Sequence, residues 1–359
     1  MKLFFDARYI RTDFHDGISR FSMELGNAIA SLTDVTFIIS DPAQLMKLPK
    51  NANHLLVHAP DSAKEPFTAY ILNRYKPDVV YSPMQTIGSL GRKFKLIVTV
   101  HDLIYYRHRT PPQQYSTLLK VGWRLYHATY AIERQVLKGV DVVATVSHTA
   151  KQDILKARLT KKPIVVVPNA PEALSHYLKR PVSLKGSPRN IVYMGSFMPY
   201  KNVETLVRAM DSLPEHRLHL LSRIKEGRKD ELLKLTQRPE NITFHNGVSD
   251  KQYAQLLADK AVLASASLDE GYGLPVAEAL ALGIPVVVSD IPIFHEVAGK
   301  GGLFFDPKSP AEFADMVKKL DDKALRTSLN KNGTRHISQY DWRKSAQTLL
   351  ETIENTLLQ

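Results

Sequence analysis

The sequence predicts an α/β protein built from two doubly wound parallel sheets. Short apolar runs rich in β-branched residues alternate with segments whose apolar residues recur at helical spacing. This alternation restarts after residues 171–188, a stretch interrupted by proline and glycine that reads as a linker. The 359 residues are also too many for one comfortable core and fit two domains of ordinary size. We therefore expect two Rossmann-like domains.

The first expected domain covers residues 1–170. Its candidate strands have the length and β-branching of buried parallel strands. They are Lys2–Phe5, Val35–Ile39, Asp78–Tyr81, Leu96–Val100, Val140–Val146 and Ile164–Val167. Apolar residues at helical spacing predict helices over Phe21–Leu32 and Thr117–Leu137.

The second expected domain covers residues 189–341 and repeats the pattern. Its candidate strands are Ile191–Met194, Arg217–Leu221, Ile242–Phe244, Ala261–Ser265 and Pro285–Ser289. A final segment, residues 342–359, is helical in pattern. Ligands of such sheets bind outside the carboxyl ends of the strands, so two sheets facing each other would form one deep cleft.

The bulk composition is that of a soluble globular enzyme, with 44% hydrophobic and 23% charged residues. The chain has no cysteine, which excludes disulfides, thiolate catalysis and cysteine-ligated metals. Asp6 and Arg8 interrupt the apolar N-terminal run, and no stretch approaches the length of a membrane span, so we expect neither a signal peptide nor a transmembrane helix. The expected location is the cytoplasm.

The net charge of +12 is concentrated in the first half of the chain. Residues 1–170 hold 23 Lys and Arg against 13 Asp and Glu, whereas residues 171–359 hold 25 against 23. A basic domain favours an acidic partner such as anionic lipid, and an ordinary basic surface that serves solubility is the alternative. No nucleic-acid-binding signature is present, so we expect no nucleic-acid partner.

The most informative motif runs from Glu270 to Glu278 and reads Glu-Gly-Tyr-Gly-Leu-Pro-Val-Ala-Glu. Pro275 favours a helix start, so Glu270 lies in a glycine-rich turn and Glu278 about one turn inside the helix. The amides and the positive end of the helix dipole would face the turn, where a diphosphate can bind between two carboxylates that accept sugar hydroxyls. A capped helix with two solvated carboxylates is the alternative reading.

The whole stretch from Ser267 to Asp290 resembles the donor-binding segment of the retaining GT-B glycosyltransferases of family four. Similar matches are Gly17-Ile18-Ser19-Arg20 near the N-terminus, Val146–Thr149 and Val167–Ala170. The resemblance spans nearly the whole chain and omits only the loops around residues 42–66 and 105–115, which we expect to face the acceptor. It implies a GT-B fold whose last helix crosses back onto the N-terminal domain.

The resemblance also implies roles for the residues of the motif. Glu278 would bind both ribose hydroxyls, and Glu270 would hold hydroxyls of the transferred sugar. The phosphate oxygens would lie against the amides of the turn and the start of the helix, at Gly271, Tyr272, Gly273 and Leu274.

His101 follows the strand Leu96–Val100 in a His-Asp-Leu context. A histidine at a strand end is by itself more often structural. In the family this histidine contacts the donor sugar near its reacting carbon, so we expect His101 to bind sugar, with Asp102 orienting the loop or the imidazole.

Cations for the leaving diphosphate come from a second set of residues. Lys201, at the start of a helix, can neutralise the charge that builds on the diphosphate, although a solvated surface lysine is the alternative. Family members usually also carry an arginine shortly after Gly195, where Ser196 and Phe197 stand here. We expect Ser196 to contact the nucleotide sugar, and Arg223 from the next strand end can supply the missing charge. Gly17 would permit close backbone approach to a diphosphate or acceptor, and a simple turn glycine is the competing interpretation.

The predicted function is retaining transfer of a hexose from a nucleotide diphosphate sugar to a hydroxyl group of a glycan or lipid-linked acceptor. The motifs look most like those of mannosyltransferases, which favours GDP-mannose, with UDP-hexoses next. No Asp-x-Asp occurs, so we expect no metal and no other cofactor. The alternatives are a nucleotide-sugar epimerase of similar fold and a catalytically dead nucleotide-sugar-binding partner.

The segment Gln113–Arg134 points to a membrane. It mixes Tyr115, Trp123, Tyr126 and several leucines with Lys120, Arg124 and Arg134. Such a helix can lie on an anionic bilayer and bring the enzyme to a lipid-linked acceptor, as a peripheral protein on the inner face of the membrane. The alternative is an ordinary amphipathic helix whose apolar side packs on the sheet.

Overall fold

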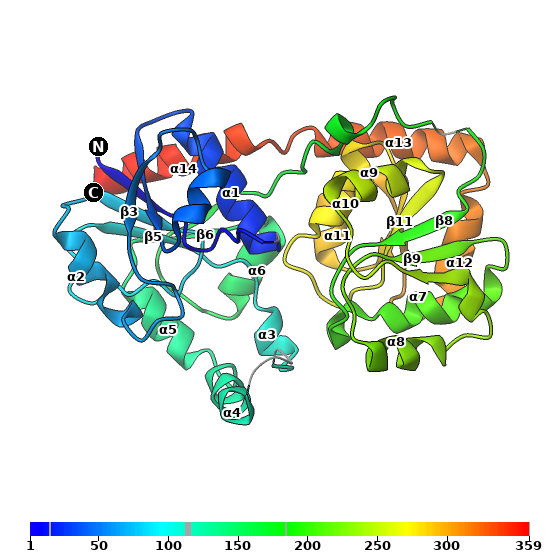
Figure 1. The fold of residues 1–359 in the computed structure, drawn as a ribbon, viewed down its shortest axis with the longest axis horizontal. Helices are drawn as coiled ribbons and strands as arrows, with labels where there is room; N and C mark the ends of the chain where they lie inside the picture. The colour runs from blue at the N-terminus through cyan, green and yellow to red at the C-terminus, as the bar shows by residue number, and fades with distance from the viewer. Residues whose placement is uncertain (14–15, 112–115, 184, 359) are drawn as a thin grey trace. The chain divides into compact units, whose positions relative to one another are not determined.

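The computed structural model describes residues 1–13, 16–111, 116–183 and 185–358. The chain folds into two compact units, each with one parallel sheet. The N-terminal unit comprises Met1–Asn169 and Tyr340–Gln359, and the C-terminal unit comprises Ala170–Gln339. In Figure 1 the C-terminal helix α14 (Trp342–Leu357), in red, lies with the blue N-terminal elements. The prediction of two doubly wound α/β units is confirmed.

The sheet of the N-terminal unit contains seven parallel strands within the described ranges, in the order β3-β2-β1-β4-β5-β6-β7. They are β1 (Leu3–Asp6), β2 (Val35–Ile39), β3 (Asn53–Leu56), β4 (Val79–Ser82), β5 (Lys95–Thr99), β6 (Val142–Thr145) and β7 (Ile164–Val166). Phe5 on β1 is in register with Phe37 on β2 and Tyr81 on β4. These three rings are buried and in contact, so the core of the unit includes this row.

The helices of this unit include the last helix of the chain. They are α1 (Gly17–Ala30), α2 (Thr68–Asn73), α3 (Ile104–Arg107), α4 (Thr117–Tyr126), α5 (Ala131–Lys138), α6 (His148–Lys156) and α14. On α14 the Trp342 ring packs edge-on against Phe21 of α1, and the Ser345 hydroxyl donates to the carbonyl of Pro168 at 2.7 Å. The last helix therefore belongs to the N-terminal unit, as the family resemblance implies.

The C-terminal unit has six parallel strands in the part of the chain that the structure describes, in the order β10-β9-β8-β11-β12-β13. They are β8 (Asn190–Tyr193), β9 (Arg217–Leu220), β10 (Ile242–Phe244), β11 (Ala261–Ser265), β12 (Val286–Ser289) and β13 (Gly302–Phe305). Its helices are α7 (Val203–Ala209), α8 (Glu226–Leu233), α9 (Asp250–Ala258), α10 (Leu274–Ala281), α11 (Pro292–Ala298), α12 (Pro310–Lys319) and α13 (Lys323–Ile337). From β8 the chain adds β9 and β10 on one side and then returns to add β11, β12 and β13 on the other. Ligands of Rossmann-like sheets bind at this switch point, between β8 and β11.

The structure differs from the sequence-based expectation at three elements. Strands β3 and β13 were not predicted, and both lie at sheet edges. β3 begins with the polar residues Asn53 and His54, and the apolar run of β13 is only Leu303–Phe305. The helix predicted over Thr117–Leu137 is two helices, α4 and α5. They part at residues 127–130, where the Arg109 guanidinium donates to the carbonyl of Ala128 and the His127 ring donates to the carbonyl of Trp123. Within the described residues, no helix is long and apolar enough to cross a membrane.

Candidate active site

The segments that follow β8 and β11 meet at the carboxyl edge of the C-terminal sheet. Because the two strands are neighbours, the turn after β8 and the glycine-rich turn after β11 lie together. The amide of Leu268 donates to the carbonyl of Tyr200 at 2.7 Å, and the side-chain amide of Asn202 donates to the carbonyl of Ala266 at 3.1 Å. These hydrogen bonds bring Lys201 and Glu270 close together although the two residues are far apart in sequence.

Lys201 and Glu270 form a direct ion pair in which Nζ lies 2.6 Å from Oε1. The same carboxylate oxygen accepts a hydrogen bond from the Ser267 hydroxyl at 2.9 Å. Both charged side chains are largely buried, so the attraction between them is screened less than that of a surface pair. The sequence-based interpretation placed both residues at the site but did not predict that they pair.

The start of α10 follows a glycine with a left-handed backbone. Gly273 has a φ of +90° and precedes Leu274, the first residue of the helix, and a side chain there would clash with the Phe294 ring. Pro275 occupies the second helical position rather than the first. No side chain caps this helix start, so its positive end remains available to a bound anion.

Two members of the motif are more buried than the sequence suggested. Tyr272 lies in the core next to Gly271, so only its backbone is suited to the predicted phosphate contact. Glu278 lies in the middle of α10 and is only 3% exposed. Burial keeps the Glu278 carboxylate in one geometry, as binding a ribose diol requires. Its role as the ribose ligand remains a prediction.

Ser196 and Arg223 follow two neighbouring strands of the same sheet. Gly195 lies so close to the Tyr193 hydroxyl that a side chain would not fit, and this hydroxyl donates to the carbonyl of Ser196 at 2.6 Å. Ser196 is thus fixed through its backbone. Arg223 is exposed and makes no hydrogen bond or ion pair in the described ranges. Its guanidinium is therefore available for a phosphate at the end of β9, next to β8.

His101 belongs to the N-terminal unit, directly after β5. Its Nε2–H donates to the carbonyl of Pro83 at 2.8 Å, and its ring packs edge-to-face against Phe21. Burial lowers the pKa of His101 to about 4, so the ring is neutral at neutral pH. With Nε2 protonated, Nδ1 is left as an acceptor that suits a sugar hydroxyl. Asp102 accepts from the amide of Ile104 at 2.9 Å and so orients the loop.

Gly17 is the first residue of α1, also in the N-terminal unit. The Asp16 carboxylate caps this helix by accepting from the amide of Ser19 at 2.8 Å. A side chain at Gly17 would meet no atom within 4 Å, so the backbone here faces open space. That space agrees with the predicted close approach of a ligand, which remains a prediction.

Sequence reasoning missed a buried ionic cluster at the end of β1. The Arg8 guanidinium bonds Asp6 at 2.8 Å and Glu65 at 2.6 Å, and His58 contacts the same Glu65 carboxylate at 3.0 Å. The spacing of Asp6 and Arg8 was visible in the sequence, but nothing local pointed to Glu65. The cluster ties the loop before α2 to β1 near the residues predicted to face the acceptor.

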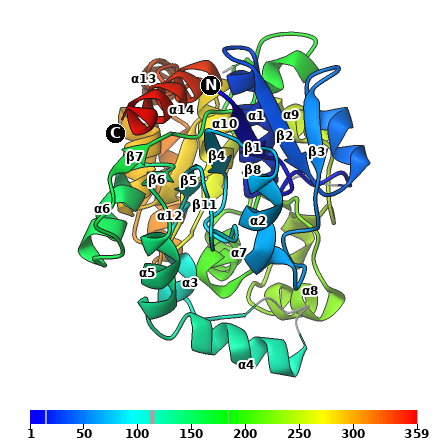
Figure 2. The same ribbon diagram turned by 90° about the vertical axis from the view of Figure 1, so that its left-hand side faces the viewer.

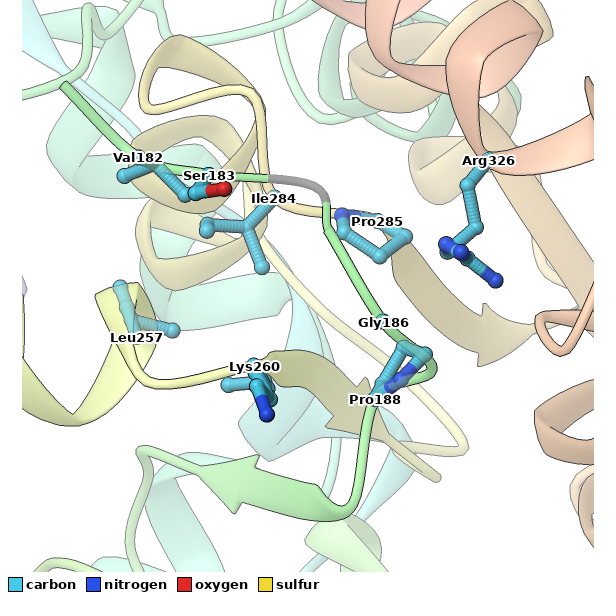
Figure 3. A pocket seen from close by; sticks show the side chains of 10 residues that line it. Val182, Ser183, Gly186, Pro188, Leu257, Lys260, Ile284, Pro285 and Arg326 are labelled. Carbon is cyan, nitrogen blue, oxygen red and sulfur yellow. The ribbon is translucent and has the colours of Figure 1, made fainter. Parts of the chain in front are cut away.

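A small pocket in the C-terminal unit lies at the opposite edge of the sheet (Figure 3). Lys260 and Pro285, which immediately precede β11 and β12, line it together with Arg326 of α13. The Arg326 guanidinium donates to the carbonyl of Leu320 at the end of α12. The cavity has a volume of about 20 Å³, which is room for roughly one water molecule. It is therefore too small to be a nucleotide site.

Comparisons with known proteins agree with the fold and the motifs. Residues 15–171 match the family described as Glycosyltransferase Family 4, and residues 175–336 match Glycosyl transferases group 1. The O-antigen chain mannosyltransferase RfbU of Salmonella typhimurium is 25% identical over 347 residues, covering 91% of this chain and 92% of RfbU. O-antigen chain mannosyltransferase B of Escherichia coli is also 25% identical, covering 95% of this chain and 96% of its own.

Solved structures share the fold at lower identity. Sucrose-phosphate synthase from Thermosynechococcus elongatus has a TM-score of 0.73 at 18% identity, covering 99% of this chain and 98% of its own. WaaG, a glycosyltransferase involved in lipopolysaccharide biosynthesis, has a TM-score of 0.69 at 17% identity, covering 98% of this chain and 99% of its own.

The two Rossmann-like sheets and the two family matches, which adjoin along most of the chain, define a glycosyltransferase of the GT-B class. The chain belongs to glycosyltransferase family 4. It is therefore an enzyme that transfers a hexose.

Proposed function

We propose that this enzyme transfers mannose from GDP-mannose to a hydroxyl group of a glycan or lipid-linked acceptor, with retention of anomeric configuration. The observation that carries the proposal is the ion pair of Lys201 and Glu270 beside the uncapped start of α10. A cation, a carboxylate and a helix dipole that lie close together suit a sugar diphosphate, and this combination supports the proposal. The names of the relatives RfbU and MMP α-(1→4)-mannosyltransferase support mannose as the sugar.

The pair gives a simple account of donor binding. In the free enzyme Lys201 and Glu270 satisfy each other. When the donor binds, it replaces this ion pair with two new interactions. Lys201 then binds a diphosphate oxygen, and the Glu270 carboxylate accepts a hydrogen bond from a sugar hydroxyl. Ser267 keeps Glu270 oriented through its hydrogen bond during the exchange.

In the reaction the bond between the anomeric carbon and the phosphate oxygen breaks, and a bond to the acceptor oxygen forms on the same face of the sugar. The acceptor proton passes to the leaving phosphate oxygen. Lys201 and the α10 dipole stabilise the negative charge that develops on the diphosphate, in the place of a metal ion. Neutral His101 accepts a hydrogen bond from a sugar hydroxyl through Nδ1.

Nucleotide preference is tested by thermal stability of the purified protein with GDP, UDP, TDP and ADP. A solved relative in fold, HepE of Anabaena, contains UDP, so UDP is the main competitor. We expect GDP to raise the melting temperature most, because a ligand at 100 times its Kd stabilises by about 2.7 kcal/mol. A larger shift with UDP would overturn mannose as the sugar, and no shift with any nucleotide would overturn the donor site.

We also propose that α4 brings the enzyme to an anionic membrane as a peripheral contact. No residue of α4 is buried, and Leu118 and Leu125 are 82% and 69% exposed. Val121 lies on the same outward face, while Trp123 turns inward against Tyr105 and His127. The apolar side therefore does not pack on the sheet.

The charges next to this face suit anionic lipid. Lys120 and Arg124 of α4 form no ion pair in the part of the chain that the structure describes. Arg134, also predicted to contact lipid, instead donates to the carbonyls of Ala157 and Arg158 at the end of α6. Tyr115 of the predicted segment lies outside the described residues. An exposed apolar stripe beside free cations has the composition of an interfacial helix.

Co-sedimentation with lipid vesicles tests the role of α4. We expect binding to vesicles with anionic lipid at low salt and release as ionic strength rises, because the Debye length falls. Replacing Leu118 and Leu125 together with serine should weaken binding by roughly tenfold or more, since both side chains lose burial in the bilayer. Equal recovery with neutral and anionic vesicles, or no loss in the double variant, would contradict this role.

A further inference from the structure

A second exposed apolar surface lies on the N-terminal unit, around α2. Phe67 ends the short helix Glu65–Phe67 that precedes α2, Tyr70 lies on α2, and Leu90 lies in the loop after β4. Their exposed fractions are 56%, 50% and 64%. We call these three residues the α2 patch. Large apolar side chains that are exposed together on one surface mark an interaction site more often than isolated ones do.

The α2 patch is held in a fixed geometry. The side-chain amide of Asn73 donates to the carbonyl of Gly91 at 2.8 Å, and its oxygen accepts from the amide of Lys93 at 2.9 Å. Gly91 has a φ of +67°, and a side chain there would clash with the Tyr70 ring. The loop therefore lies directly against α2 and presents Leu90 beside Tyr70.

Contacts within the unit connect the α2 patch to α4. The loop reaches the end of α5, because Ser89 touches Gly139 and the Arg92 guanidinium donates to the carbonyl of Gly139 at 2.9 Å. At the other end of α5, Glu133 accepts from the Tyr126 hydroxyl of α4 at 2.9 Å. In Figure 1, α2, α5 and α4 follow one another along the lower left of the unit, and in Figure 2 α4 lies below both α2 and α5. The α2 patch and α4 are thus linked through α5 within the same unit.

The charges around the α2 patch are also positive. Lys64, Arg74 and Lys93 are exposed and form no side-chain ion pair in the described ranges. The nearby carboxylates of Glu65 and Asp141 are engaged by Arg8 and Arg92, which leaves the exposed Asp61 against the three cations. The patch therefore combines exposed apolar groups with unpaired cations, as α4 does, and this combination matches an anionic bilayer.

We propose that the α2 patch is a second contact with the anionic membrane that α4 binds. The inference rests on the proposed membrane role of α4. A single interfacial helix leaves the protein free to rotate about it, whereas two separate contacts, one at the α2 patch and one at α4, fix the orientation of the N-terminal unit on the bilayer. Orientation of this unit sets where a lipid-linked acceptor meets the enzyme.

Single cysteine variants provide the test, because the chain has no cysteine of its own. Leu90→Cys, Leu118→Cys and Leu155→Cys are each labelled with a fluorophore whose emission shifts to the blue in an apolar environment. Leu155 is an exposed leucine on α6 and serves as the matched control. Unchanged melting temperatures establish that the labelled variants are folded. The probe is a vesicle of phosphatidylcholine with or without phosphatidylglycerol.

We expect a blue shift at positions 90 and 118 with phosphatidylglycerol vesicles and none at position 155. A shift at position 118 alone would overturn the second contact and leave the role of α4 standing. No shift at either position would overturn both proposals, and a shift at position 90 alone would overturn the paired contact. As a second measurement, the double variant Phe67→Ser with Leu90→Ser should bind vesicles roughly tenfold more weakly; unchanged binding would also overturn the proposal.

Discussion

Replacing Lys201 with alanine should lower turnover by about 10²–10³-fold while leaving the fold intact. The lysine charge matters most as the diphosphate leaves, so its loss should affect kcat more than donor binding. In the free enzyme the substitution removes the ion pair of Glu270, whose carboxylate still accepts the hydrogen bond from the Ser267 hydroxyl. Steady-state kinetics with the melting temperature measured in parallel separate a catalytic loss from an unfolded variant.

Two comparisons sharpen this test. Lys201→Arg keeps the charge and should retain part of the activity, and Arg223→Ala tests whether the exposed arginine shares the diphosphate. Activity should also survive EDTA, because Lys201 and the α10 dipole take the place of a metal. Normal turnover in Lys201→Ala, or strict dependence on added Mn²⁺ or Mg²⁺, would contradict the mechanism.

Replacing Glu278 with alanine should weaken binding of bare GDP by about 1.5–3 kcal/mol, or roughly 10–150-fold. The buried carboxylate would lose both ribose hydroxyls, whereas Glu270→Ala removes contacts that bare GDP does not make. Calorimetry with GDP compares the two variants directly.

Glu278→Gln serves as the control for folding, because it keeps the shape of a side chain that is almost fully buried. It should lose affinity without losing stability. Equal GDP affinity in the Glu278 and Glu270 alanine variants would show that the ribose and sugar contacts are assigned to the wrong carboxylates.

The fold was predictable from the sequence because buried parallel strands are continuous apolar runs. Most central strands, such as β1, β5 and β11, are such runs, although the central strand β9 contains Arg217 and His219. The edge strands β3 and β13 were missed, because β3 begins with two polar residues and the apolar run of β13 is only three residues long. The break between α4 and α5 is also not visible in the local sequence. The hydrogen bond at the break comes from Arg109, which lies outside the predicted helix Thr117–Leu137, and goes to the carbonyl of Ala128.

The residues of the candidate site were visible in the sequence, but their partners were not. Glycine, proline and two carboxylates marked the start of α10 because that turn requires their backbone and charge. The ion pair of Lys201 with Glu270 joins residues 69 positions apart and depends on β8 and β11 being neighbours. Sequence spacing alone contains no such information, and the same holds for the bond from Arg8 to Glu65.

The most direct measurement is product analysis of purified enzyme with GDP-mannose and simple mannoside acceptors. Chromatography follows free GDP, and NMR of the anomeric proton reports the new linkage. We expect GDP to be released in step with a mannosylated acceptor that keeps the anomeric configuration of the donor. An inverted linkage would contradict retention, an isomerised donor would indicate an epimerase, and an unchanged donor that nevertheless binds would indicate a catalytically dead binding partner.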